Sequence, residues 1–333
     1  MSKNLIIIAE AGVNHNGSVR TAKKLIDSAS SIGADYIKFQ TFEPNLIVTN
    51  YAQIAPYQKK ILKKKTNQKK LLTKLSLSNN EFLQLKLYCK KKNIGFLSSA
   101  FDLKSLIFLN KIGLQIFKIP SGELTNYPYL KLVGSFNKKI YLSTGMATLR
   151  EIQFALNTLI DSGCNKKNIY ILHCVSDYPT QFKDLNLNFI PVLKKIFKTE
   201  VGFSDHSPGV EASVAAVALG AVVIEKHFTL NKKMEGPDHN MSLDVNEFSN
   251  LIKMLKNTEC SLGSSKKIIT KKENILKKFA RKSIVASYKI YKGDIFTENN
   301  LTTKRPGNGK SPILWKNIIG KVAKNNYEKD EKI

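Results

Sequence analysis

One stretch, residues 201–228, decides the fold and reads VGFSDHSPGVEASVAAVALGAVVIEKHF. Residues 201–203 and 222–224 are short apolar runs, as is typical of strands buried on both faces of a parallel sheet. Residues 210–219, between them, carry apolar side chains at helical spacing. The stretch therefore predicts a strand, a crossover helix and a second, parallel strand.

The same alternation repeats from the start of the chain to about residue 256. The predicted strands are residues 5–9, 36–39, 94–97, 116–119, 140–142, 169–172, 201–203 and 222–224, and the predicted helices are residues 19–31, 80–91, 103–112, 148–162, 188–197, 210–219 and 244–256. Eight such units in ~250 residues match the α/β fold of a TIM (β/α)8 barrel. A doubly wound sheet would need a Gly-x-Gly-x-x-Gly loop after the first strand, and residues 10–17, EAGVNHNG, lack it.

The chain changes character after this barrel. Residues 258–279 are rich in lysine, serine and asparagine, which favours a linker or an exposed helix. Residues 280–333 contain short strand-like runs and Gly-rich turns. The predicted division is a barrel over 1–257, a linker over 258–279 and a small β-rich domain over 280–333, and because so small a unit buries little surface we expect it to lean on a partner.

Composition excludes several classes of protein. The 333 residues carry a net charge of +27, but only four of the 53 basic residues are arginine, the side chain that base-edge readout favours. We therefore expect small anions as partners rather than specific nucleic acid. No apolar run reaches the ~20 residues of a membrane span, and no secretory leader is evident, so we expect a cytoplasmic protein.

Polar side chains follow every predicted strand, and a barrel gathers these positions at one rim. Lys38 and Lys118 lie within apolar strands, where an ammonium group is costly unless it is paired or binds an anion. Hydroxyls would surround them, from Ser99, Ser121, Ser143 and Ser204. This combination predicts a site for a phosphate or a carboxylate.

Two histidines follow adjacent strands near the end of the barrel. His206 comes after the seventh strand and His227 after the eighth, so both imidazoles are expected within reach of one divalent cation, with coordination positions left for substrate and water. Glu10 and Glu123 are the candidates for proton transfer. Together these groups suit carbon–carbon bond formation between a phosphorylated anion and a metal-polarised carbonyl, and they leave donor and acceptor open.

Several motifs are familiar. They are residues 9–17, AEAGVNHNG; 37–42, IKFQTF; 117–123, FKIPSGE; 142–146, LSTGM; 202–206, GFSDH; 225–229, EKHFT; and 236–239, GPDH. Together they resemble the sialic acid (N-acylneuraminate) synthase family. Residues 279–286, FARKSIVA, and 304–307, KRPG, resemble that family's C-terminal antifreeze-like (SAF) domain.

The resemblance implies condensation of phosphoenolpyruvate with an N-acylated amino sugar, giving a nonulosonic acid and phosphate. It implies Mn²⁺, or Mg²⁺ or Co²⁺, on His206 and His227. Phosphoenolpyruvate would bind the lysines and serines of the anion site, Glu123 would be the base for the attacking water, and the sugar would bind Glu10, Gln40, Tyr178 and Asp238. Arg305 would come from the SAF domain of a neighbouring subunit in a domain-swapped homodimer.

The sugar stays open at this point. N-Acetylmannosamine is the first expectation, which would make the chain an N-acetylneuraminate synthase. Because Ser176 replaces an asparagine common in neuraminate-type loops, a 2,4-diacetamido-trideoxymannose, as in N,N'-diacetyllegionaminate synthesis, is the alternative. Another phosphoenolpyruvate-using or metal-dependent aldolase-type enzyme and a non-catalytic carbohydrate- or anion-binding protein are the competing classes.

Overall fold

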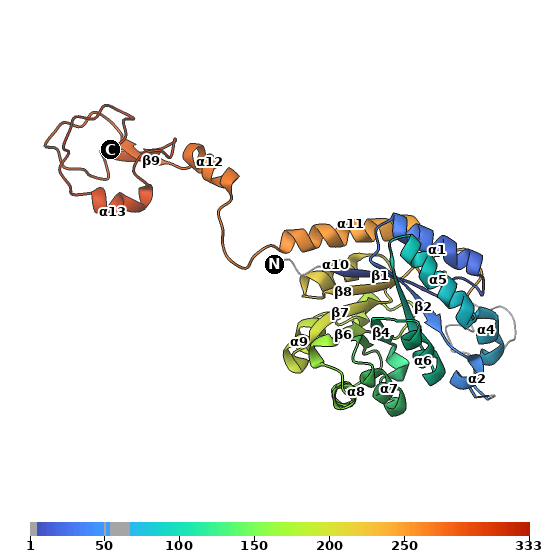
Figure 1. The fold of residues 1–333 in the computed structure, drawn as a ribbon. Coiled ribbons are helices and arrows are strands. Elements are labelled where there is room, and N and C mark those ends of the chain that lie inside the picture. Colours follow the sequence, from blue (N-terminus) through green and yellow to red (C-terminus); the bar gives the residue numbers. More distant parts are fainter. Residues whose placement is uncertain (1–4, 50, 54–66) are drawn as a thin grey trace. The chain divides into compact units, whose positions relative to one another are not determined.

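Eight parallel strands close into a barrel in the computed structural model, which describes residues 5–49, 51–53 and 67–333 (Figure 1). The strands are β1 (Ile6–Gly12), β2 (Tyr36–Thr41), β3 (Gly95–Ala100), β4 (Ile116–Ile119), β5 (Lys139–Ser143), β6 (Ile169–Cys174), β7 (Glu200–Asp205) and β8 (Val223–His227). They pair in chain order, and β8 pairs in parallel with β1 to complete the circle. The predicted TIM (β/α)8 barrel is confirmed.

Successive side chains of each strand point to opposite faces, so one set packs outward against the helices and the other packs inside the barrel. On β1, Ile7 and Ala9 pack outward with the helices in the main hydrophobic core, while Ile8 packs inside the barrel. The interior cluster is completed by Leu97, Ile116, Tyr141, Leu172 and Val223. Two residues further along most strands the inward side chains become polar, as at Glu10 after Ile8 and Lys118 after Ile116. The apolar layer therefore forms a floor beneath a polar rim.

Helices surround the strands (Figure 1). In the barrel unit they are α1 (Val19–Ser31), α2 (Pro44–Ile47), α4 (Gln68–Leu75), α5 (Asn79–Lys91), α6 (Leu103–Lys111), α7 (Tyr127–Ser135), α8 (Leu149–Asp161), α9 (Phe189–Phe197), α10 (Glu211–Ala218) and α11 (Val245–Leu262). Capping boxes begin α5, α8 and α11, where Ser78, Thr148 and Asp244 each pair with a glutamate three residues on. No helix among the described residues is long and apolar enough to cross a membrane.

Among the described residues, three helices of the barrel unit, α2, α4 and α7, were not predicted, and the sequence of α7 carries both proline and glycine. Pro128 lies in the first turn, where its missing N–H is not needed, and Asn126 caps that turn by accepting from Tyr129 N. A Cβ on Gly134 would lie 2.8 Å from Leu159 O on α8. Gly134 therefore allows α7 to pack closely against α8.

The chain divides after Gly263 into the barrel unit and a second unit, Ser264–Ile333. The predicted barrel end at 257 falls inside α11, which continues to Leu262, and the predicted linker 258–279 contains most of α12 (Lys271–Ala280). The second unit contains β9 (Ser283–Ala286), antiparallel β10 (Leu301–Lys304) and the short helix α13 (Trp315–Ile318). It has its own small core, which includes Ile284, Ile290, Phe296, Leu301 and Ile333. The predicted small β-rich C-terminal domain is confirmed.

Candidate active site

A cavity of about 370 Å³ lies at the carboxyl ends of the barrel strands. Such a volume is within the range of small-molecule sites, ~300–1,000 Å³. Most of the residues singled out from the sequence line it: Glu10, Lys38, Gln40, Ser99, Lys118, Ser121, Ser143, Tyr178, Ser204, His206, His227 and Asp238. The expectation that the strand ends gather these side chains at one rim is met.

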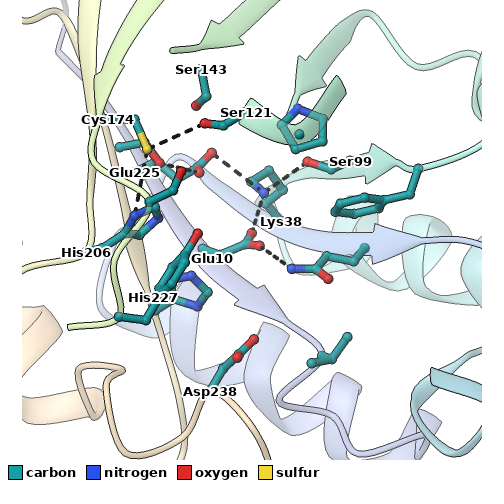
Figure 2. A pocket seen from close by; sticks show the side chains of 18 of the residues that line it. Glu10, Lys38, Ser99, Ser121, Ser143, Cys174, His206, Glu225, His227 and Asp238 are labelled. Carbon is teal, nitrogen blue, oxygen red and sulfur yellow. Dashed lines mark hydrogen bonds and ion pairs between the residues drawn. The ribbon is translucent and has the colours of Figure 1, made fainter. Parts of the chain in front are cut away.

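Two lysines and two carboxylates form the base of the cavity, and Figure 2 labels three of them, Lys38, Glu10 and Glu225. Lys38 Nζ lies 2.7 Å from Glu10 Oε2 and 3.7 Å from Glu225 Oε2. Lys118 Nζ lies 3.0 Å from Glu225 Oε1, so Glu225 bridges the two ammonium groups. All four side chains are nearly excluded from solvent. The sequence predicted that the two lysines form a binding site for a phosphate or a carboxylate. In the structure, carboxylates of the chain balance their charges.

The environment separates the acidities of these two carboxyl groups. Burial by itself raises the pKa of Glu225, but the Lys118 and Lys38 ammonium groups outweigh it and lower the pKa to about 2. Burial also raises the pKa of Glu10, and there the effect exceeds the opposing attraction of Lys38. Paired carboxyl groups with separated pKa values are the usual arrangement for acid–base chemistry. Glu225 is thus a fixed anion, while Glu10 is the group better suited to take up a proton.

Hydroxyl groups complete the base of the cavity. Ser99 Oγ accepts a hydrogen bond from Lys38 Nζ at 3.1 Å, and Ser204 Oγ donates to Glu225 Oε1 at 3.0 Å. Among the described residues, no group hydrogen-bonds the buried Ser143 hydroxyl. A buried hydroxyl without a partner is unfavourable, so Ser143 is suited to hydrogen-bond a ligand that enters the cavity.

Next to these hydroxyls, the backbone at Gly145 lies close to the side chains of Ser121 and Ser176. Gly145 N donates to Ser121 Oγ at 3.0 Å. A Cβ on Gly145 would collide with Ser176 Oγ and lie 2.8 Å from Ser121 Oγ. Glycine is therefore required here for Ser121 and Ser176 to lie against the β5 loop.

The two imidazoles lie together, with ring centroids 5.6 Å apart (Figure 2). His206 Nδ1 is 2.8 Å from Val175 O, and because a carbonyl only accepts, Nδ1 donates and Nε2 is the nitrogen left for a ligand. Burial by itself lowers the pKa of His206, but the Cys174 sulfur and Val175 O outweigh it and raise that pKa, so a metal ion at Nε2 would displace a proton. Burial, followed by the charges of His206 and Lys38, lowers the pKa of His227 well below its ordinary value. Tyr178 packs on His206 with ring centroids 4.3 Å apart.

This donor set fits a divalent cation with open coordination positions. Imidazole nitrogens are good ligands for divalent transition-metal ions, and Mn²⁺ in addition favours oxygen ligands such as water, carbonyl and carboxylate. His227 Nδ1 is buried without a hydrogen-bond partner in the part of the chain that the structure describes. That same part contains no group of three or more His, Cys, Asp or Glu side chains placed to hold a metal ion. Any cation on His206 and His227 would therefore complete its coordination with water or substrate.

Asp238 lines the same cavity near Glu10. Burial, together with the charge of Glu10, raises its pKa to about 7. The backbone around Asp238 is fixed by Ser242, whose hydroxyl donates to Asp238 O at 2.6 Å, and Asn14 Nδ2 in turn donates to Ser242 Oγ at 2.9 Å. Part of the asparagine-rich motif after β1 therefore positions Asp238 instead of lining the cavity.

Two of the residues selected from the sequence lie elsewhere. Glu123 is in the 3₁₀ turn Ser121–Glu123, does not line the cavity, and accepts a hydrogen bond from Asn126 Nδ2 at 2.6 Å. Arg305 belongs to the second unit, where its Nε donates to Ala280 O at 2.9 Å. Their proposed roles as a base and as a residue supplied by a partner subunit stay predictions.

Sequence reasoning placed Glu225 among the polar residues at the strand ends but gave it no role, and it missed the apolar side of the cavity. Glu225 stands two residues before His227 on β8, so the two share a strand face, and this spacing was the available signal. The apolar side consists of Val13, Leu71, Leu72, Leu75 and Phe101. The leucines come from α4, for which no helix was predicted, so nothing in the strand pattern pointed to them.

Comparison with known proteins gives a consistent family. The NeuB family model matches residues 25–267 and the SAF domain model matches residues 281–333. The chain is 49% identical over 331 residues to the N,N'-diacetyllegionaminic acid synthase of Campylobacter jejuni, covering 99% of each chain. It is 39% identical to the synthase of the same name from Legionella pneumophila, covering 96% of this chain and 90% of the other. The solved N-acetylneuraminic acid synthetase of Leptospira borgpetersenii superposes with a TM-score of 0.72 at 32% identity, covering 82% of this chain and 90% of that one.

Proposed function

This chain belongs to the NeuB family, and on that basis we propose that it condenses phosphoenolpyruvate with an N-acylated amino sugar to form a nonulosonic acid. In the balanced reaction, phosphoenolpyruvate, the open-chain aldose and one water give the nonulosonic acid and inorganic phosphate. One carbon–carbon bond forms between C3 of the enol and the aldehyde carbon. The C2–oxygen link to phosphate is lost after water adds at C2.

The basic end of the cavity suits the anionic donor. Lys38 and Lys118 supply charge, and Ser99, Ser121 and Ser143 supply directional hydrogen bonds. On binding, the donor's carboxylate and phosphate oxygens compete with Glu10 and Glu225 for the two ammonium groups. Ser143, whose hydroxyl has no partner among the described residues, gains one.

Glu10 is placed to move a proton in this reaction. Its carboxylate lies 2.7 Å from Lys38 Nζ, within the wall that also carries His227 and Asp238. Its raised pKa makes Glu10 a better proton acceptor than Glu225, which stays ionised and holds Lys118 in place. We therefore favour Glu10 over Glu123 for proton transfer, since Glu123 does not line the cavity.

His206 and His227 would hold the divalent cation. Mn²⁺ is the first expectation from the family resemblance, and it would take its other ligands from water and substrate oxygens. When bound, the cation would polarise the carbonyl oxygen of the acceptor as a Lewis acid. The chain's own contribution is to fix the tautomer of His206 through Val175 O and to keep His227 neutral. Tyr178 restricts the orientation of the His206 ring.

Two acceptors remain candidates. The higher identity to the two diacetyllegionaminic acid synthases favours a 2,4-diacetamido-trideoxymannose. The likeness to an N-acetylneuraminic acid synthetase supports N-acetylmannosamine as the second candidate. Gln40, Tyr178 and Asp238 are the polar groups that we assign to either sugar.

A homodimer in which the SAF domains are exchanged completes the proposal. The SAF unit buries only a small core of its own, which is consistent with support from another subunit. Arg305 would then reach the sugar site of the neighbouring subunit.

The observation that carries the proposal is the convergence of Lys38, Lys118, His206 and His227 on one cavity. The test is phosphate release from phosphoenolpyruvate with Mn²⁺ and each of three sugars: N-acetylmannosamine, 2,4-diacetamido-2,4,6-trideoxymannose and mannose. We expect release with an N-acylated sugar and none with mannose. A folded protein that binds these sugars but releases no phosphate with any of them would instead be a non-catalytic binding protein.

A further inference from the structure

The cavity has two chemically distinct sides. Its base carries the lysines, carboxylates, hydroxyls and imidazoles, while a second side, here called the α4 wall, consists of Val13, Leu71, Leu72, Leu75 and Phe101. The α4 wall is part of a small hydrophobic cluster that is separate from the main core and also contains Phe42. The apolar side chains of this cluster therefore continue from a packed interior onto the surface of the cavity.

The α4 leucines and Phe101 come from an arc of the barrel away from the imidazoles, whereas Val13 follows β1, which pairs with β8. Helix α4 lies between β2 and β3, and Phe101 follows β3. His206 follows β7 and His227 ends β8. An acceptor whose aldehyde lies at the imidazoles has its opposite end free to extend across the cavity toward the α4 wall.

An aliphatic surface discriminates between a methyl and a hydroxymethyl group. Leu71 and Leu75 are buried, Leu72 is half-buried, and none carries a polar side-chain atom that a sugar hydroxyl could bind. A hydroxyl pressed against them loses water without gaining a partner, whereas a methyl group gains buried apolar contact. On this wall, an acceptor that ends in a methyl group binds better than one that ends in CH₂OH.

We propose that the α4 wall, through Leu72 in particular, selects acceptor sugars that are deoxygenated at C6. This inference rests on the proposed function and sharpens it, because it chooses the 6-deoxy diacetamido acceptor over N-acetylmannosamine. Leu72 is the best position for a substitution, because it lines the cavity and is only half-buried. Leu71 is buried, so the stability of the fold depends more on Leu71 than on Leu72.

The test uses acceptor pairs that differ by a single oxygen: N-acetylmannosamine against its 6-deoxy analogue, and 2,4-diacetamido-2,4-dideoxymannose against the 2,4,6-trideoxy sugar. The measured quantity is the ratio of kcat/KM for the 6-deoxy acceptor to kcat/KM for its 6-hydroxy partner. A hydrophobic site rejects a similar ligand that carries an added hydroxyl by about 10²-fold, so we expect a ratio of at least about 10 in the wild-type enzyme. We expect Leu72→Asn to reduce the ratio about tenfold with the KM for phosphoenolpyruvate unchanged, and Leu72→Met to preserve it.

Leu87→Asn is the matched control, because Leu87 lies on α5, is 60% exposed and does not line the cavity. It should leave the ratio at the wild-type value. Equal use of both members of each pair by the wild type, or an unchanged ratio in a folded Leu72→Asn variant, overturns the inference and leaves the proposed function standing. Absence of turnover with every N-acylated acceptor overturns both.

Discussion

Replacing Lys118 by methionine separates the binding role of its charge from its structural role. Lys118 Nζ lies 3.0 Å from Glu225 Oε1, and both side chains are about 5% exposed. At an effective dielectric constant of about 20, two unit charges at this distance attract by about 5 kcal/mol, before the cost of burial is subtracted. Methionine keeps the length and apolar character of the stem but leaves Glu225 short of one partner.

The structure gives the magnitude of each effect. Removing one member of a buried pair costs ~3–5 kcal/mol, and the remaining contacts of Glu225 to Ser204 and, at 3.7 Å, to Lys38 place the expected loss near the lower limit. Losing the charge that faces phosphoenolpyruvate should cost ~2–4 kcal/mol in its use, or about 30- to 900-fold in kcat/KM. The KM for the sugar should stay within a few-fold, since Lys118 is assigned to the donor.

Urea unfolding and steady-state kinetics measure the two effects separately. The double variant Lys118→Met/Glu225→Gln should regain most of the stability, because no unpaired carboxylate remains, but not the use of phosphoenolpyruvate. Lys226→Met is the matched control: Lys226 is an equally buried lysine that pairs with Asp205 at 2.7 Å but does not line the cavity. It should lose stability with no selective effect on phosphoenolpyruvate. A folded Lys118→Met enzyme with an unchanged donor profile would refute the assignment.

The remaining predictions concern the metal, the acidity of Asp238 and the SAF domain. Excess EDTA should abolish turnover and Mn²⁺ should restore it, and full activity in EDTA would remove the imidazole–metal hypothesis. The folded-state pKa of Asp238 is raised to about 7, so its contribution to the free energy of unfolding falls as pH rises from about 4 to 7. In metal-free protein, the stability gained by Asp238→Asn should therefore grow over this pH range to at most about 4 kcal/mol and level off above pH 7. A difference in urea midpoints that does not change with pH contradicts this. Arg305→Ala and His206→Ala chains, each inactive, should recover activity when mixed as heterodimers, and proven heterodimers without activity would argue against an arginine supplied by the partner.

The barrel was predictable because its signal is local and repeated. Each buried strand is a short apolar run, and the crossover helices carry capping residues such as Thr148 and Asp244 that mark their starts. Helix α7 was not predicted because Pro128 and Gly134 reduce helix propensity. Tertiary packing against α8 compensates for that loss.

The site was predictable to the extent that it follows from strand register. Every second residue of a strand points inward, so once one residue of a pair such as Lys38 and Gln40 is placed at the cavity, the other is placed there as well. The same holds for Ser204 and His206. What register does not give is charge balance, because the pairing of Lys118 with Glu225 joins β4 to β8, 107 residues apart. Nor does it give the α4 wall, which depends on how a helix outside the barrel pattern packs over the cavity.

The most direct test of the central claim is the fate of the three carbons of phosphoenolpyruvate. The protein is incubated with ¹³C₃-labelled phosphoenolpyruvate, Mn²⁺ and an N-acylated acceptor, and the products are analysed by mass spectrometry together with phosphate release. We predict one nonulosonic acid carrying all three labelled carbons for each phosphate released. Phosphate released while the label stays in pyruvate, with no labelled sugar acid, would contradict the account.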